Sequence, residues 1–244
     1  MRKNNRKLSE KRKFKILADY ITNADGSVLA SMGNTRVICT ATIEDTVPRF
    51  LKNSGTGWLT AEYAMIPAST NTRKRREIKS GRQDGRGKEI ERIIGRSLRT
   101  AIDFSALGEY TITLDCDVID ADGGTRTTAI NGAWVAIALA LKKLANETGL
   151  DSFNNVLIHQ IGAISAGIKK GDIYIDLDYE EDSSIDADCN IVINENKDIV
   201  DIQATSEQKS FSNDILNKLI HLSSESIEEI FITQKQILEE KYKE

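Results

Sequence analysis

The chain of 244 residues, 40% hydrophobic and 29% charged, has the composition of an ordinary globular protein with a sizeable core. Its longest apolar run, 133–141, is too short to cross a bilayer, and the basic start lacks the apolar region of a signal peptide, so we expect no membrane association. Three widely spaced cysteines without a CxxC pair argue against a structural zinc site and favour the reducing cytoplasm.

The distribution of charge is more informative than its total. A formal net charge of -4 and a pI near 5.5 argue, taken alone, against binding to nucleic acid. However, residues 1–15 carry eight Lys or Arg against one acid, and residues 73–99 carry eleven against four. The acids gather after residue 170. A concentrated arginine cluster can bind a polyanion locally even on an acidic protein.

The predicted elements follow from apolar periodicity along the chain. In chain order they are strands at 35–43 and 58–66, a helix at 86–104, a strand at 110–119, a helix at 127–146, strands at 155–171, 173–179 and 189–205, and helices at 211–222 and 224–242. Strands that cluster around helices without strict alternation predict the α+β class. We expect a single compact domain over 1–244, with a mixed β-sheet and packed helices.

The helix predicted at 86–104 has two distinct faces. Its isoleucines and leucine recur on one side at helical spacing, while Arg92, Arg96 and Arg99 lie on the other. This arginine stripe is either a solvated, salt-bridged face or a surface that faces RNA or another subunit.

The stretch "DCDVIDADGGTRTTAINGA" (115–133) places a strand, a glycine turn and a helix start in succession. Gly123 and Gly124 let the backbone approach a ligand closely. Thr125 supplies a hydroxyl, and Arg126 supplies a fork suited to phosphate. The first helical turn would aim free N–H groups at the same place. The stretch predicts an anion cradle, with a simple turn before a helix as the alternative.

The stretch "DIYIDLDYEEDSSIDADCN" (172–190) holds eight carboxylates and no Lys or Arg. Strand alternation would place Asp172, Asp176 and Asp178 on one face, and after a turn a second strand would place Asp186 and Asp188 on one face. Carboxylates on adjacent strand ends converge on a hard divalent cation, Mg²⁺ or Mn²⁺. The alternative is a wet, acidic hairpin.

Several long motifs, in matching order and spacing, resemble bacterial ribonuclease PH. They are "GWLTAEYAMIP" (57–67), "NTRKRRE" (71–77), "GRSLRTAIDFSALGEYTITLDCDVIDADGGTRT" (95–127) and "DLDYEEDSSIDADCNIV" (176–192). The resemblance implies the ribonuclease PH-like (ribosomal protein S5 domain 2-like) fold, shared with polynucleotide phosphorylases and exosome ring subunits. It further implies a phosphate-dependent 3′→5′ exoribonuclease that trims tRNA precursors, and a homohexamer built as a trimer of dimers.

The resemblance also implies roles for individual residues. Those that match phosphate-binding positions are Arg86, Gly124, Thr125 and Arg126. Asp182 and Asp188 match the paired catalytic, metal-associated aspartates. Arg73 and Arg76 match loop arginines that contact tRNA, and Arg75 joins them because Ala68 stands where many members have an arginine. The implied reaction has inorganic phosphate, as co-substrate, attack the terminal phosphodiester with Mg²⁺ or Mn²⁺ as the cofactor.

Two alternatives to this function stay open. A Mg²⁺-dependent hydrolase would use the same aspartates with water as nucleophile, but it gives no reason for a second anion site at Arg86 and Arg126. An RNA-binding ring component without activity is expected to lose the aspartates or the cradle, and this chain keeps both.

Overall fold

The computed structural model describes residues 2, 5–76, 85–149, 155–206 and 210–243, and its strands form two sheets. The first sheet has the order β1-β2-β3-β5-β4 and is antiparallel except for the parallel pair β4/β5. Its strands are β1 (Phe14–Ala18), β2 (Gly26–Met32), β3 (Thr35–Glu44), β4 (Trp58–Met65) and β5 (Thr111–Asp120). It is the mixed sheet that the sequence predicted.

The second sheet is antiparallel throughout and has the order β7-β6-β8-β9. Its strands are β6 (Ile161–Lys169), β7 (Asp172–Ile175), β8 (Ala187–Asn194) and β9 (Ile199–Ser206). The helices are η2 (Arg49–Leu51), α2 (Gly85–Arg99), α3 (Phe104–Leu107), α4 (Thr125–Thr148), α5 (Tyr179–Asp182) and α6 (Asn213–Lys241). The α+β class is therefore confirmed.

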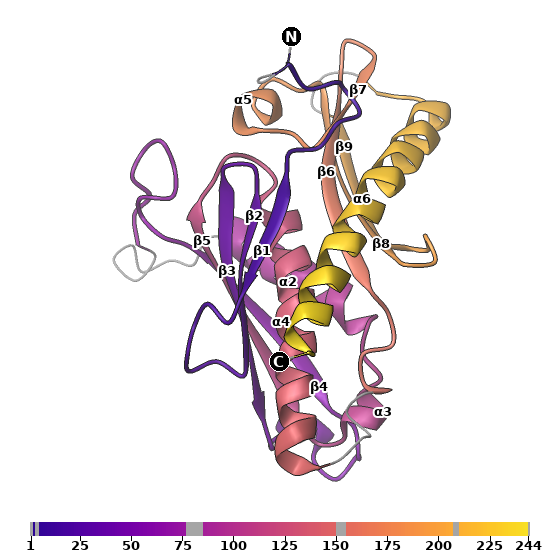
Figure 1. Cartoon of the computed structure of the whole chain (residues 1–244). Coiled ribbons are helices and arrows are strands. Elements are labelled where there is room, and N and C mark those ends of the chain that lie inside the picture. The colour runs from indigo at the N-terminus through magenta and orange to yellow at the C-terminus, as the bar shows by residue number, and fades with distance from the viewer. Residues whose placement is uncertain (1, 3–4, 77–84, 150–154, 207–209, 244) are drawn as a thin grey trace.

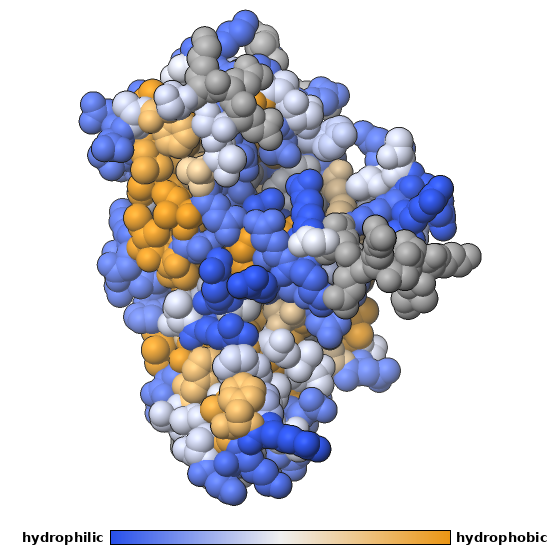
Figure 2. Space-filling model, turned by 180° about the vertical axis from the view of Figure 1, so that it is seen from behind, coloured by the Kyte–Doolittle hydropathy of each residue, from blue (hydrophilic) through white to orange (hydrophobic). Residues whose placement is uncertain are grey.

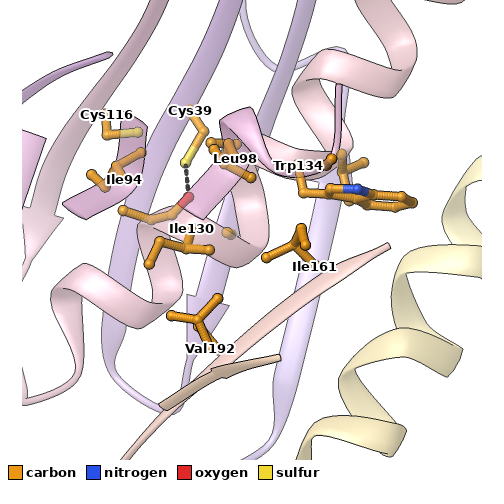
Figure 3. Close-up of a cluster of buried hydrophobic side chains, with 14 of the residues drawn as sticks. Cys39, Ile94, Leu98, Cys116, Ile130, Trp134, Ile161 and Val192 are labelled. Carbon is orange, nitrogen blue, oxygen red and sulfur yellow. Dashed lines mark hydrogen bonds between the residues drawn. The ribbon is translucent and has the colours of Figure 1, made fainter. Parts of the chain in front are cut away.

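Helix α4 lies between the two sheets and forms the centre of the core (Figure 1). It packs on β2 and β3 on one side and on β6 on the other. Among the described residues it is the one helix long and apolar enough to span a membrane, but 78% of that window is buried, as in the core helix of a folded protein. Figure 3 shows the cluster around it, in which Ile130 and Trp134 of α4 lie among side chains of both sheets and of α2.

Asn131 joins α4 to the second sheet through a polar contact inside this core. Its side-chain amide donates to the carbonyl of Ala163 at 2.8 Å and accepts from the N–H of Ala163 at 2.7 Å. The short strand β7 pairs with only the second half of β6, from Ala166 on. Asn131 therefore satisfies backbone groups of β6 that would otherwise be buried without a partner.

Several predicted elements differ from those in the structure. The two C-terminal helices are one, α6, because Ser223 and Ser224 are buried within it and the hydroxyl of Ser224 bonds to the carbonyl of Ile220. The segment 189–205 is a hairpin, β8 and β9, closed by a turn at Asn194 whose side chain accepts two backbone N–H groups. The strand predicted at 155–171 begins only at Ile161, and β1 and β2 precede the first predicted strand.

The arginine stripe of α2 divides between structural and exposed members. Arg99 lies over the ring of Trp58, 4.4 Å from its centroid, and donates to the carbonyl of Leu59 at 2.9 Å. Arg96 lies 3.8 Å from Asp201 of β9, while Arg92 is exposed. Seen from behind, hydrophilic side chains cross the middle of the molecule below an apolar area over the second sheet (Figure 2). In that sheet, β9 exposes Ile199 and Ile202.

Candidate active site

A cavity of about 710 Å³ lies between the two sheets at the N-terminal end of α4. Strand β4, the start of α2 and the turn before α4 line one side, and β6, α5 and β8 line the other. Of the residues singled out from the sequence, it brings together Arg73, Arg86, Gly124, Thr125, Arg126, Asp182 and Asp188. Arg75 and Arg76 are exposed and do not line it. Residues more than 100 positions apart in sequence thus share one cavity.

The predicted anion cradle is a tight turn that leads into α4. Gly123 and Gly124 have φ of 79° and 65°, in the left-handed region that favours glycine. Gly124 is the N-cap of α4 and has no side chain to accept the first N–H groups of the helix. These N–H groups lack acceptors within the helix, and they carry the positive end of its dipole. The turn can therefore receive an anion.

Two side chains outside the predicted set organise this cradle. The hydroxyl of Tyr63 on β4 donates to Thr125 Oγ1 at 2.8 Å, and burial raises the pKa of Tyr63, so it stays protonated as a donor. Gln203 on β9 accepts a hydrogen bond from Arg126 Nη1 at 3.2 Å. Local sequence signals gave no indication of either residue, because each acts from a distant strand.

The acidic stretch is neither a wet hairpin nor a strand with carboxylates in one row. Strand β7 ends at Ile175, and Asp178 instead caps α5 through a reciprocal capping box with Glu181. Asp176 and Asp178 are buried, 1% and 3% exposed. The strand predicted at 173–179 is confirmed only as far as Ile175. Beyond it the prediction is wrong, because Asp176 and Asp178 are drawn into contacts with the N-terminal segment.

Three N-terminal arginines neutralise these buried acids. Arg12 holds Asp176 through two side-chain hydrogen bonds of 2.8 and 2.6 Å. Arg2 binds both oxygens of Glu181, at 2.7 and 2.8 Å, and Arg6 lies 3.2 Å from the same carboxylate. The basic start of the chain thus serves to hold the acidic stretch. Asp176, Asp178 and Glu181 are therefore paired with arginines and are not solvated in the way that the alternative of a wet, acidic hairpin required.

Asp182 and Asp188 are the two of the eight carboxylates that line the cavity. No Lys or Arg in the described part of the chain pairs with Asp188. Burial, and secondly the charge of Asp188, raise the pKa of the neighbouring thiol of Cys189 to about 12. Asp188 therefore brings to the cavity a carboxylate that forms no ion pair with a described basic side chain.

These two carboxylates fit a divalent ion that is bound together with a substrate. Within the described ranges, no group of three or more His, Cys, Asp or Glu side chains forms a ready-made cage. Mg²⁺ is commonly held by one or two carboxylates, with the remaining ligands from water and substrate phosphates. Asp182 and Asp188 supply hard oxygen donors of the kind that Mg²⁺ and Mn²⁺ prefer.

The pKa of Glu181 predicts how the free energy of unfolding depends on pH. Burial alone would raise the pKa of Glu181, but hydrogen bonds from Arg2 and from the N–H of Asp178, together with the charges of Arg2 and Arg6, outweigh it, so the net pKa is lowered. A lowered pKa stabilises the fold above the ordinary value of 4.5, and this contribution is lost as the pH falls through the folded-state pKa. We expect Glu181→Gln to lower the free energy of unfolding at pH 7 by about 2 kcal/mol, and to weaken its dependence on pH below 5.

Denaturant unfolding at several pH values between 7 and 3 measures this effect. Glu180→Gln is the matched control, because Glu180 is the exposed neighbour on the same short helix. Equal losses of stability in the two variants at pH 7 would contradict the role given to the Arg2–Glu181 pair.

Comparison with solved structures places the fold in a known class. The chain superposes on rice (Oryza sativa) Rrp46 with a TM-score of 0.78 at 18% identity, covering 97% of this chain and 100% of that one. A chain of the Archaeoglobus fulgidus exosome with RNA bound to its active site superposes with a TM-score of 0.74 at 21% identity, covering 99% of this chain and 92% of that one. A chain of an archaeal exosome core superposes with a TM-score of 0.71 at 18% identity, covering 94% of this chain and 89% of that one. The fold is that of exosome subunits.

Comparison with models of protein families identifies the family within this class of fold. Domain 1 of the 3′ exoribonuclease family matches residues 10–143, and domain 2 of the same family matches residues 159–226. The chain belongs to the 3′ exoribonuclease family. The first match contains the cradle and Arg86, and the second contains Asp182 and Asp188, so the cavity lies where the two meet. That the chain is one domain over 1–244 stays a prediction.

Proposed function

We propose that this protein is a phosphate-dependent 3′→5′ exoribonuclease of the ribonuclease PH type, which trims the 3′ ends of tRNA precursors and releases nucleoside diphosphates. The observation that carries the proposal is the cavity itself. It combines an anion cradle and two arginines, Arg86 and Arg126, with the two carboxylates Asp182 and Asp188. One anion site and one cation site side by side suit a reaction in which two phosphate groups must meet.

In the proposed reaction, inorganic phosphate bound at Arg126 and the backbone of Gly124 and Thr125 is the nucleophile. One of its oxygens forms a bond to the phosphorus of the terminal phosphodiester. The bond from that phosphorus to the 3′ oxygen of the preceding nucleotide breaks, and this oxygen takes a proton from water. The products are a nucleoside diphosphate and an RNA shortened by one nucleotide. No protein nucleophile is required.

The chain's own residues orient the reactants and offset their charge. Arginine forks and helix N-terminal N–H groups hold phosphate oxygens in fixed directions, which places the nucleophile for attack. A Mg²⁺ or Mn²⁺ ion held by Asp182 and Asp188 would supply positive charge to the reacting phosphate. Arg73, with Arg75 and Arg76 beyond the cavity, offers contacts to the RNA backbone.

We also propose that the protein acts as a homohexamer, a trimer of dimers. The support is the likeness in fold to exosome subunits and the edge strand β9, which exposes Ile199 at 50% and Ile202 at 36%. Exposed apolar side chains on a sheet edge are the kind of surface that assembly covers.

The test is an incubation of the purified protein and Mg²⁺ with a 3′-extended tRNA precursor, with and without inorganic phosphate. Nucleoside diphosphates that appear only with phosphate support phosphorolysis. An unstructured oligonucleotide with the same 3′ tail is the matched substrate, and faster trimming of the precursor supports the tRNA preference. Monophosphates released without phosphate would mean a hydrolase. Bound RNA without any product would mean an RNA-binding ring component.

A further inference from the structure

The two sides of the cavity meet where the turn before α4 contacts the loop between β7 and α5. A Cβ atom on Gly123 would lie 2.3 Å from the carbonyl oxygen of Leu177 and 2.9 Å from the Cα of Asp178. The cradle of the first sheet is therefore in direct backbone contact with the loop that leads to Asp182.

Arg12 lies at this junction and binds both loops. On the cradle side, its guanidinium donates to the carbonyl oxygens of Asp122 and, at 3.3 Å, of Gly123. On the other side, it donates to both carboxylate oxygens of Asp176 and, at 3.1 Å, to the carbonyl of Leu177. Arg12 is 9% exposed and does not line the cavity. Its charge is matched by Asp176, so it acts on the site through the backbone.

Thr35 binds the same turn from β3. Its hydroxyl donates to the carbonyl of Gly123 at 2.6 Å and accepts from the N–H of Asp122 at 2.9 Å. Thr35 is fully buried, so no water replaces these bonds if they are removed. The carbonyls of Asp122 and Gly123 are thus both held on the protein side of the turn.

The orientation of these carbonyls determines where the N–H groups of the turn point. A trans peptide is planar, with its N–H opposite to its C=O, and the described residues contain no cis peptide. Holding the carbonyls of Asp122 and Gly123 towards Arg12 and Thr35 turns the N–H groups of Gly123 and Gly124 away from them. An anion needs N–H groups and is repelled by carbonyl oxygens. A rotated peptide would replace a donor of the cradle by an acceptor.

We propose that Arg12 and Thr35 are positioning residues of the phosphate site, which hold the peptides at 122–124 with their N–H groups towards the bound phosphate. This inference rests on the proposed function, because it assigns inorganic phosphate to the cradle. Arg12 also fixes the cradle relative to the loop that leads to α5 and Asp182. Burial alone would lower the pKa of Arg12, but hydrogen bonds with Asp176 and the charges of Asp176, Asp122 and Asp178 together raise it, so the guanidinium stays charged across the working pH range.

The test compares Thr35→Val, which keeps the shape but removes the hydroxyl, with Thr35→Ser, which keeps the hydroxyl. We expect Thr35→Val to raise the KM for phosphate and its Kd, measured by calorimetry with inorganic phosphate, by about 10- to 100-fold. The affinity for RNA, measured by fluorescence anisotropy without phosphate, should stay within about twofold, because this turn is not assigned to the RNA backbone. Thr35→Ser should restore the phosphate values.

Arg12→Lys provides a second, independent variant, because a lysine keeps the charge but cannot bind both loops at once. We expect a loss of phosphate affinity at least as large as that of Thr35→Val. A folded Thr35→Val or Arg12→Lys protein with unchanged phosphate affinity would overturn the inference, and so would equal losses of phosphate and RNA affinity. Wild-type protein that binds no phosphate would overturn the proposed function as well, and this outcome is visible before any variant is made.

Discussion

Replacing Arg126 by alanine is expected to lower kcat/KM for phosphorolysis by about 10²- to 10³-fold, the effect of removing one charged donor from a preorganised anion site. Arg126 stands in the first turn of α4, lines the cavity and is oriented by Gln203. Its loss leaves the cradle with the backbone N–H groups and the hydroxyl of Thr125, and leaves Arg86 as the arginine of the proposed phosphate site. The KM for phosphate should rise, while the affinity for RNA in the absence of phosphate should change little.

Arg49→Ala is the matched control for this substitution. Arg49 is an exposed arginine on η2, outside the cavity, so its removal changes the net charge equally. Rates measured for both variants over a range of phosphate concentrations separate a local effect from a general loss of positive charge. Similar rates for Arg126→Ala and wild type would remove Arg126 from the phosphate site.

Replacing Asp188 by asparagine is expected to lower kcat by about 10³-fold, since the side chain keeps its shape but loses the charge that holds a divalent ion. Asp188 has no basic partner in the part of the chain that the structure describes. Its charge therefore contributes no ion pair to the fold, and the variant should be at least as stable as the wild type. A loss of activity together with unchanged or raised stability is typical of a functional carboxylate.

Two measurements test this expectation. Titration of activity with Mg²⁺ or Mn²⁺ should show that Asp188→Asn needs a much higher concentration of metal, while calorimetry shows phosphate still bound. Asp172→Asn is the control, because Asp172 belongs to the same acidic stretch but is exposed at the start of β7. Full activity of Asp188→Asn at low Mg²⁺ would show that the carboxylate does not hold the ion.

Local patterns in the sequence predicted the elements that build the cradle. Strand β5 and helix α4 lie close to their predicted ranges, because apolar periodicity depends on near neighbours. Helix α2 begins near its predicted start but ends at Arg99 instead of 104. The cradle could be recognised for the same reason. Its glycines, its arginine and its helix start all lie within a few consecutive residues, and the structure places them around one cavity.

In the acidic stretch at 172–190, local patterns in the sequence did not predict the secondary structure correctly. Alternation of charged and apolar residues suggested a strand through Asp178, but a buried carboxylate adopts whatever conformation brings it to a cation. Asp176 meets Arg12, 164 positions away, and Glu181 meets Arg2, 179 positions away. Nothing in the neighbourhood of either acid indicates these partners, so neither β7 nor α5 could be bounded correctly.

The sequence by itself therefore determined the α+β class, the family resemblance, the cradle and the set of carboxylates from which a metal site could be drawn. Only the tertiary structure decided which carboxylates the N-terminal arginines neutralise, and it placed Asp182 and Asp188, which the resemblance had already singled out, on the same cavity as the cradle. It also revealed Tyr63, Gln203, Thr35 and Arg12 around the cradle. The physical reason is that ion pairs and hydrogen bonds depend on separation in space, which chain folding sets independently of separation in sequence.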